Sequence, residues 1–259
     1  MTDDLELLVE RKGHVMTLTI NREKRRNALS ASVALALNNA LREADRDLEV
    51  RVICITGAGD KAFCAGGDLA ADMSSGQGAE EAIHTFADLM ATMDSLGTPL
   101  IARVNGHCMG GGVGLVLGCD VAIATEQAKF GTPEVQAGMF PMIIAPMIIR
   151  HAGPKQAMDM ILGGRKISAQ KALELGFVNL VVPAEDLDET VGEILEDILA
   201  GSPSAIRIGL QALSKTRNLP LGQASVKLGQ ELLKVLATED AMEGIGAFFE
   251  KRKPKWKGK

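Results

Sequence analysis

Tyrosine is absent from this sequence of 259 residues, and aromatic residues together make up only 3% of it. Apolar residues nevertheless reach 46%, so the core must be packed from Leu, Ile, Val, Ala and Met. An excess of positive charge is also lacking, since the net charge is −5 at pH 7. Sites for single-stranded nucleic acid combine basic grooves with aromatic stacking platforms. We therefore expect no nucleic-acid partner.

Cysteine is scarce, and no two cysteines form a C-x-x-C pair. The four are Cys54, Cys64, Cys108 and Cys119. In a chain of this size, such spacing predicts reduced and mostly buried thiols, as in cytoplasmic proteins, and no structural zinc or other metal site.

Long apolar runs are missing too, and none approaches the roughly 20 residues of a membrane span. The longest candidate, Met139–Ile149, is short and contains two prolines. The acidic start, Met1–Asp4, lacks the basic and apolar segments of a signal peptide. We expect a cytoplasmic protein with no membrane partner.

Short strand-like runs alternate with helical periods in the first half of the chain, and the second half is mostly helical. Strands are predicted at His14–Ile20, Val50–Thr56, Leu100–Val104, Asp120–Ala124 and Val178–Val182. Helices are predicted at Ser32–Asp45, Glu81–Leu96, Leu187–Leu199, Ser204–Leu213, Leu221–Leu236 and Ala241–Arg252. Strands separated by crossovers favour an α/β arrangement rich in parallel pairs.

Three glycines in a row, Gly110–Gly112, are the most informative feature that is present. They follow the apolar run Pro99–Val104, expected to be a buried strand, and precede Leu115–Leu117, expected to begin a buried helix. Bare backbone N–H groups at such a junction suit an anion or a developing oxyanion. A tight turn with close packing is the alternative.

Two further segments, Lys61–Leu69 and Phe130–Glu134, follow strand patterns in the same way. Together with Asn105–Gly114 they resemble the crotonase (enoyl-CoA hydratase/isomerase) superfamily. The similarity extends over nearly the whole chain, through the segments Asn21–Leu29, Gly163–Ala169 and Thr238–Arg252.

This resemblance implies an α/β fold in which a spiral of ββα units is followed by a helical C-terminal subdomain. Residues 1–200 would form the spiral core and residues 201–259 the subdomain that mediates trimerisation. It also implies an acyl-CoA substrate, with coenzyme A as part of the substrate and no separate cofactor. The expected assembly is a homotrimer or a dimer of trimers.

By the same resemblance, the backbone N–H groups of Gly67 and Gly111 form an oxyanion hole for a thioester enolate. Glu134 lies between Pro133 and the apolar Val135, and a partly apolar pocket raises the pKa of a carboxyl group. We therefore interpret Glu134 as the catalytic base. Residues implied to contact the substrate or its CoA are Arg25, Arg26, Ala28, Ala65, Gly67, Asp68, Leu69, Gly111, Met139, Phe140 and Lys251.

Some of these residues also have a plainer interpretation. Asp68 is alternatively a structural acid that caps a helix or turn, and the basic cluster Arg22–Arg26 is alternatively a solvated loop. Met139 and Phe140 either reshape an acyl pocket or mark the entrance of a core helix. Lys251 is expected to reach the CoA of a neighbouring subunit, while the basic C-terminus is equally typical of a solubilising tail.

Gly114 departs from the hydratase pattern, in which a first glutamate stands two residues beyond the glycine triplet and a second stands at the position of Glu134. Adding water needs a nucleophile activated and a proton delivered, which suits two carboxylates, whereas moving a double bond needs one base. The sequence therefore favours isomerisation of Δ3 to Δ2 enoyl-CoA.

Two alternatives to isomerisation stay open. One is an enoyl-CoA hydratase in which another group replaces the missing glutamate, the nearest candidates by sequence being His84, His107, Glu126 and His151. The other is a non-catalytic homologue that only binds acyl-CoA, which Gly114 favours and the retained Glu134 argues against.

Overall fold

The computed structural model describes residues 5–68 and 78–259. Its larger sheet has six strands in the order β1-β2-β3-β5-β7-β10. Their bounds are β1 Leu7–Lys12, β2 Val15–Ile20, β3 Val52–Gly57, β5 Leu100–Val104, β7 Val121–Thr125 and β10 Leu180–Val182. Only β1 runs antiparallel to its neighbour within this order, so the parallel-rich arrangement is confirmed.

A second sheet of four short strands was not predicted from the sequence. Its order is β4-β6-β8-β9, formed by β4 Ala62–Cys64, β6 His107–Met109, β8 Lys129–Gly131 and β9 Lys166–Ser168. A strand of three residues is too short to show a hydrophobic period, which is why pattern analysis missed these four.

Successive strands alternate between the two sheets, so β3 leads into β4, β5 into β6 and β7 into β8. The corners between them are tight. The buried Asn105 side chain donates to the carbonyls of Gly57 and Gly59 and joins two neighbouring corners. A helix follows each such pair of strands, and this repetition confirms the expected spiral of ββα units.

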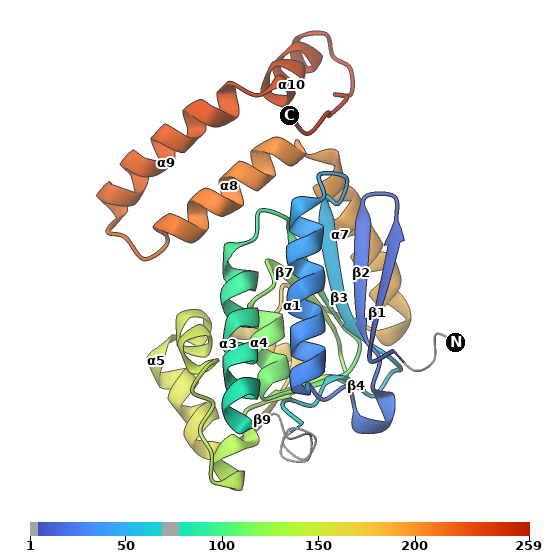
Figure 1. The fold of residues 1–259 in the computed structure, drawn as a ribbon, viewed down its shortest axis with the longest axis vertical. Coiled ribbons are helices and arrows are strands. Elements are labelled where there is room, and N and C mark those ends of the chain that lie inside the picture. Colours follow the sequence, from blue (N-terminus) through green and yellow to red (C-terminus); the bar gives the residue numbers. More distant parts are fainter. Residues whose placement is uncertain (1–4, 69–77) are drawn as a thin grey trace.

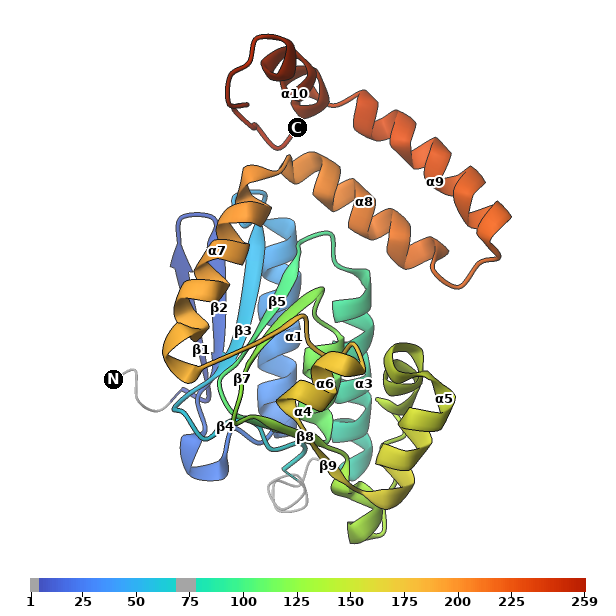
Figure 2. The same cartoon turned by 180° about the vertical axis from the view of Figure 1, so that it is seen from behind.

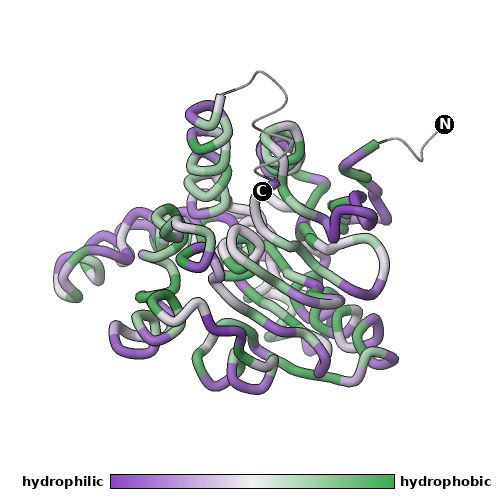
Figure 3. Tube along the Cα trace, turned by 90° about the horizontal axis from the view of Figure 1, so that it is seen from below, coloured by the Kyte–Doolittle hydropathy of each residue, from purple (hydrophilic) through white to green (hydrophobic). Residues whose placement is uncertain are grey.

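Helices cover both faces of the larger sheet. Helices α1 (Ala31–Arg46), α3 (Ala79–Ser95) and α4 (Gly111–Leu117) lie on one face, and α7 (Leu187–Ala200) lies on the other (Figures 1 and 2). Helix α1 buries Val33, Leu37 and Leu41 at helical spacing, and the hydroxyl of Ser30 caps its first turn. Green and purple alternate along the outer helices in Figure 3, as amphipathic packing requires.

The remaining elements of this core are short or irregular. They are η1 Glu23–Arg25, η2 Pro133–Ala137, α5 Ala145–Gly163, α6 Ala169–Glu174 and η3 Ala184–Asp186. Helix α5 was not predicted because Gly153, at φ 74°, and Pro154 interrupt its hydrophobic period.

The expectation that Leu115–Leu117 begin a helix is wrong, since these residues end α4. That helix begins at Gly111. Its second residue, Gly112, packs tightly against Cys64, where a Cβ atom would lie 2.7 Å from the carbonyl oxygen.

Helices α8 (Pro203–Thr216), α9 (Leu221–Leu236) and α10 (Glu239–Phe249) extend from one end of this core (Figure 1). Asp240 is buried and accepts hydrogen bonds from the hydroxyl of Ser204 and the backbone of Lys257, which fixes the C-terminal segment against α8 and α10. The basic C-terminus is therefore packed rather than a free tail. Among the helices of residues 5–68 and 78–259, none combines the length and apolar character needed to cross a bilayer.

Candidate active site

Two loops from distant parts of the sequence are joined edge to edge below the larger sheet. The N–H of Leu29 donates to the carbonyl of Gly66 at 2.8 Å, and the N–H of Asp68 donates to the carbonyl of Leu29 at 2.7 Å. In such a parallel bridge, the intervening residue, Gly67, keeps its own N–H directed away from the pair. A third bond, from Ala65 to the carbonyl of Arg26, brings the early basic loop to the same place.

The Gly66–Gly67 loop meets the glycine triplet directly. At Gly66, whose φ is 96°, a Cβ atom would lie 3.5 Å from Cα of Gly110 and 3.6 Å from the backbone nitrogen of Gly111. Gly111 opens α4, where the first N–H groups have no acceptor within the helix. Within the part of the chain that the structure describes, neither Gly67 nor Gly111 donates its N–H to a protein acceptor. Two free donors thus lie on neighbouring segments.

Glu134 places its carboxylate beside this glycine junction. Its Oε1 atom lies 2.9 Å from where a Cβ atom of Gly110 would be, and the φ of 51° at Gly110 is a conformation that favours glycine. Its Oε2 atom is buried and has no hydrogen-bond partner among the described residues. Burial raises the pKa of this carboxyl above 4.5. A carboxylate with one buried oxygen free of protein partners, next to two free N–H donors, is equipped to exchange a proton with a bound molecule.

Apolar side chains pack against α4 at Gly111 and Gly114. A Cβ atom at Gly114 would lie 2.5 Å from Cγ2 of Ile144 and 3.2 Å from Sδ of Met90, and one at Gly111 would lie 3.2 Å from Cζ of Phe86. Position 114 therefore has no room for a carboxylate in this packing. The sequence had shown that a glutamate is missing there, but the contact with Ile144 comes only from the fold.

The sequence matches the enoyl-CoA hydratase/isomerase family over residues 10–259. The chain belongs to this family. The 2,3-dehydroadipyl-CoA hydratase of Escherichia coli is 38% identical over 256 residues, which cover 98% of this chain and 99% of that protein. The short-chain-enoyl-CoA hydratase of Clostridium acetobutylicum is 32% identical, with 95% of each chain covered. An enoyl-CoA hydratase from Bacillus anthracis, solved as a crystal structure, superposes with a TM-score of 0.93 at 36% identity, covering 98% of this chain and 100% of its own.

The protein therefore belongs to a family of enzymes and has the crotonase fold, as the resemblance implied. The assignments of single residues rest on the geometry of this chain. The backbone brings Ala28, Ala65 and Gly67 together around Arg26, beside Gly111 and Glu134. Leu69 lies outside the described residues.

Asp68 has a structural role in this family member. Its carboxylate pairs with Arg22 at 2.8 Å, and the side chains of Asp68 and Arg22 are only 7% and 10% exposed. Arg22 also pairs with Glu6 at 2.7 Å and donates to the carbonyl of Ala28. The guanidinium group of Arg22 thus bonds to groups of the protein itself, unlike the exposed cations of the same loop. Nothing in the sequence pattern pointed to Glu6 as its partner.

A cationic surface that sequence reasoning missed lies on the outer face of the second sheet. Cys108 pairs with Phe130 and Gly131 pairs with Lys166, so the neighbouring His107, Lys129 and Lys166 share one face of that sheet. Desolvation and then the charges of Lys129, Lys166 and Arg26 lower the pKa of His107 below 6.5. The lowered pKa favours the neutral imidazole, so the positive charge of the surface comes mainly from Arg26 and the two lysines.

The other sequence candidates lie apart from the glycine junction. His84 faces Glu80 on the exposed side of α3 at 3.8 Å, and the ring of His151 bonds the carbonyl of Met147 within α5. Met139 and Phe140 follow Glu134 closely and are 38% and 36% exposed. Lys251 follows α10, at the opposite end of the molecule from Gly111 (Figure 1), so within one chain it does not join the site.

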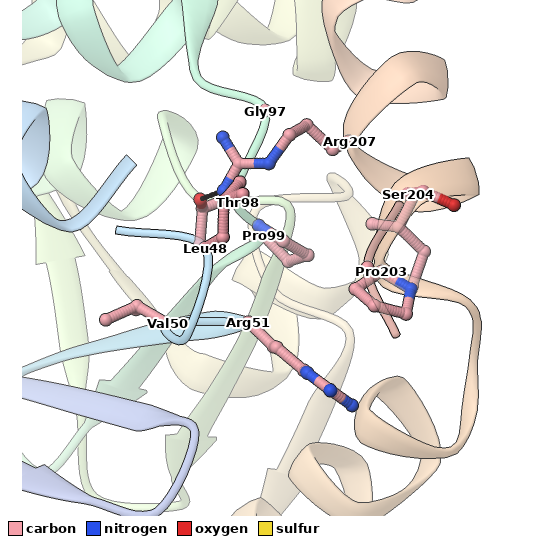
Figure 4. Close-up of a pocket in the computed structure, with 11 residues that line it drawn as sticks. Leu48, Val50, Arg51, Gly97, Thr98, Pro99, Pro203, Ser204 and Arg207 are labelled. Carbon is pink, nitrogen blue, oxygen red and sulfur yellow. Dashed lines mark hydrogen bonds between the residues drawn. The ribbon is translucent and has the colours of Figure 1, made fainter. Parts of the chain in front are cut away.

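Figure 4 shows a small cleft at the other end of the larger sheet, where the parallel strands begin. Arg207 of α8 donates to Thr98 and to the carboxylate of Asp45 there, at 2.9 and 3.1 Å. These bonds attach α8 to the core. None of the predicted site residues lines this cleft, and the reactive groups all lie near the carboxyl ends of the strands.

Proposed function

We propose that this protein is an enoyl-CoA isomerase that moves a double bond from Δ3 to Δ2 through a thioester enolate. The observation that carries the proposal is the carboxylate of Glu134, whose Oε2 atom has no partner among the described residues, beside two free N–H donors, with position 114 closed to a second acid by Ile144. One base is sufficient for isomerisation, whereas hydration also requires water to be activated.

In this reaction Glu134 removes a proton from the carbon next to the thioester carbonyl. The electrons move to the thioester oxygen, where the N–H groups of Gly67 and Gly111 hold the developing charge. Removing one such donor from an oxyanion hole typically costs about 3 kcal/mol of transition-state stabilisation. Glu134 then returns its proton two carbons further along the chain, and the double bond re-forms next to the carbonyl. Protons and electrons balance with no further reactant.

The CoA portion of the substrate is assigned to the loops that meet at Leu29. Arg25, Arg26 and Ala28 lie on one loop, and Ala65 and Gly67 lie on the other. Lys129 and Lys166 add positive charge near Arg26, which suits the phosphates of CoA. Met139 and Phe140 are assigned to the border of the acyl site, and no cofactor beyond the CoA of the substrate is proposed.

The alternative is an enoyl-CoA hydratase, which the names of the relatives favour. Two assays decide between them, one following isomerisation of 3-hexenoyl-CoA and the other following hydration of crotonyl-CoA. Isomerisation without hydration, lost in Glu134→Gln, is the expected result. Fast hydration would establish the alternative. Silence in both assays with CoA still bound would point to a binding protein without turnover.

We also propose that the enzyme works as a homotrimer or a dimer of trimers. Helix α9 has no buried residue within one chain, although it is rich in leucine. Exposed apolar residues of α9 and α10 are Leu221, Val226, Leu232, Leu233, Leu236, Met242, Ile245, Phe248 and Phe249. An apolar surface of this kind is typical of a subunit interface. In such an assembly Lys251 would contact the CoA bound to a neighbouring subunit.

A further inference from the structure

Gly110 is the N-cap of α4, with φ 51° and ψ −124°, and Gly114 is the fourth residue of that helix, about one turn further along the chain. A Cβ atom at Gly110 would meet Oε1 of Glu134 at 2.9 Å, and one at Gly114 would meet Cγ2 of Ile144 at 2.5 Å. One turn of helix is about 5.4 Å long. The methyl group of Ile144 therefore lies about one turn further along α4 than the carboxylate of Glu134.

Ile144 is held firmly in this position. It is 2% exposed, it stands at the N-cap of α5, and its carbonyl accepts hydrogen bonds from Met147 and Ile148. Its β-branched side chain has few alternative rotamers. The atom 2.5 Å from the Cβ position of Gly114 is a methyl group on Cβ of Ile144 rather than the far end of a flexible chain, so Ile144 cannot easily vacate this space.

The neighbours of Ile144 extend the same apolar wall along α4. Met90, 7% exposed, lies 3.2 Å from the Cβ position of Gly114, and Phe86 lies 3.2 Å from that of Gly111. None of the three side chains donates a hydrogen bond, and only the weakly accepting sulfur of Met90 is polar. A bound water needs two to four polar partners, which this wall does not supply.

We propose that Ile144 is a specificity-determining residue that keeps water away from the acyl carbons beside Glu134. Hydration requires a water oxygen to bond the double-bond carbon that lies farther from the carbonyl, while a proton is delivered to the double-bond carbon next to the carbonyl. With Ile144 in place, that oxygen has no hydrogen-bonded position on the α4 side, and the enolate can only take back the proton held by Glu134. This inference rests on the proposed isomerase function.

The packing part of the inference is tested without any assay of activity. Gly114→Ala should lower the melting temperature of the otherwise unchanged protein by roughly 3 °C or more, because the added methyl group collides with Ile144. In an Ile144→Ala background the same substitution should raise it, because alanine favours a helix over glycine. Ile148 is a fully buried residue of α5, and Ile148→Ala provides the matched control background, in which Gly114→Ala should still lower the melting temperature. Additive effects of Gly114→Ala and Ile144→Ala would overturn the inference.

The functional part is tested with Ile144→Thr and Ile144→Val. The side chains of threonine and valine have nearly the same shape, but threonine has a hydroxyl group where valine has a methyl group. The ratio of crotonyl-CoA hydration to 3-hexenoyl-CoA isomerisation should rise at least about tenfold in the threonine variant, the effect of one hydrogen bond, and stay within about twofold in the valine variant. Equal ratios in the two variants, or fast hydration by the unchanged enzyme, would overturn the inference. Absence of isomerisation in the unchanged enzyme, with the melting-temperature coupling intact, would overturn the proposed function alone.

Discussion

Glu134 shows at the scale of one residue why a site can conflict with stability. Buried polar atoms are nearly always hydrogen-bonded in folded proteins, yet Oε2 of Glu134 has no partner among the described residues. Burial also raises the pKa of this carboxyl, which means that the folded state disfavours its charge. Both features weaken the fold and strengthen a base, as expected for a group reserved for a ligand.

Replacing Glu134 by glutamine should therefore separate activity from stability. Isomerisation should fall by about 10²- to 10⁴-fold in kcat/KM, the usual contribution of a general base. The melting temperature should stay the same or rise, because a neutral amide avoids the desolvation of the carboxylate. Steady-state kinetics and thermal unfolding of the same preparation measure the two effects. An active Glu134→Gln variant would exclude Glu134 as the base.

The raised pKa of Glu134 also predicts two dependences on pH. As a base it acts when ionised, so kcat/KM should rise with pH through an apparent pKa above 4.5. The stability cost of its charge is present above that raised folded-state pKa and vanishes below the unfolded value, near about pH 4. Unfolding of the parent and of Glu134→Gln at several pH values tests this. The advantage of the variant should be largest near neutrality and disappear in acid, and a constant difference would contradict the assignment.

The ion pair of Arg22 and Asp68 adds a side-chain contact between two loops that backbone hydrogen bonds also join. It ties the loop before α1 to the loop after β4, and both side chains are nearly buried. Arg22→Ala should lower the free energy of unfolding by about 3–5 kcal/mol, because it breaks a buried pair. Arg11→Ala is the control, since the Arg11–Asp47 pair is 42% and 40% exposed, and its loss should cost no more than about 1 kcal/mol. Denaturant unfolding measures the free energy of unfolding of both variants. Equal losses of free energy would show that the buried ion pair contributes no more to stability than the exposed one.

At the scale of elements, hydrophobic periodicity predicted the helices and strands that are long enough for the pattern to repeat. The bounds of α9, Leu221–Leu236, and of β5, Leu100–Val104, agree with the prediction. The three-residue strands of the second sheet have no period, and α5 is interrupted by Gly153, so neither could be found in this way. The spiral itself came from resemblance to a family, because strand order depends on contacts between distant segments.

In the candidate site, too, the residues of local motifs could be predicted from the sequence, whereas contacts between distant segments could not. Backbone donors at Gly67 and Gly111 and the acid at Glu134 lie in local motifs that a sequence can display. Ile144 lies thirty positions after Gly114 and meets it only through the packing of α5 on α4. Likewise, Lys129 and Lys166 become neighbours through the pairing of β8 with β9. Local patterns thus show which chemistry is available, and tertiary contacts decide what limits it.

The whole molecule places its reactive groups and its apolar surface at opposite ends. The glycine junction and Glu134 lie at the carboxyl ends of the strands, and α8–α10 extend from the other end (Figure 1). Within one chain, the side chains of Leu233 and Phe249 are 67% and 77% exposed. Exposed apolar side chains of this size rarely gather on a monomer. The C-terminal helices are therefore expected to pack on neighbouring subunits.

Leu233→Asp and Phe249→Asp should break this assembly, because each places a charge in an apolar interface. Size-exclusion chromatography with light scattering should give three or six times the chain mass for the parent and a smaller mass for both variants. Leu35→Asp is the control, since Leu35 is 49% exposed on α1, away from these helices, and the mass should not change. A parent protein that runs as a monomer would refute the proposed assembly. If Lys251 completes the CoA site of a neighbour, the dissociated variants should also show a higher KM while circular dichroism reports an intact fold.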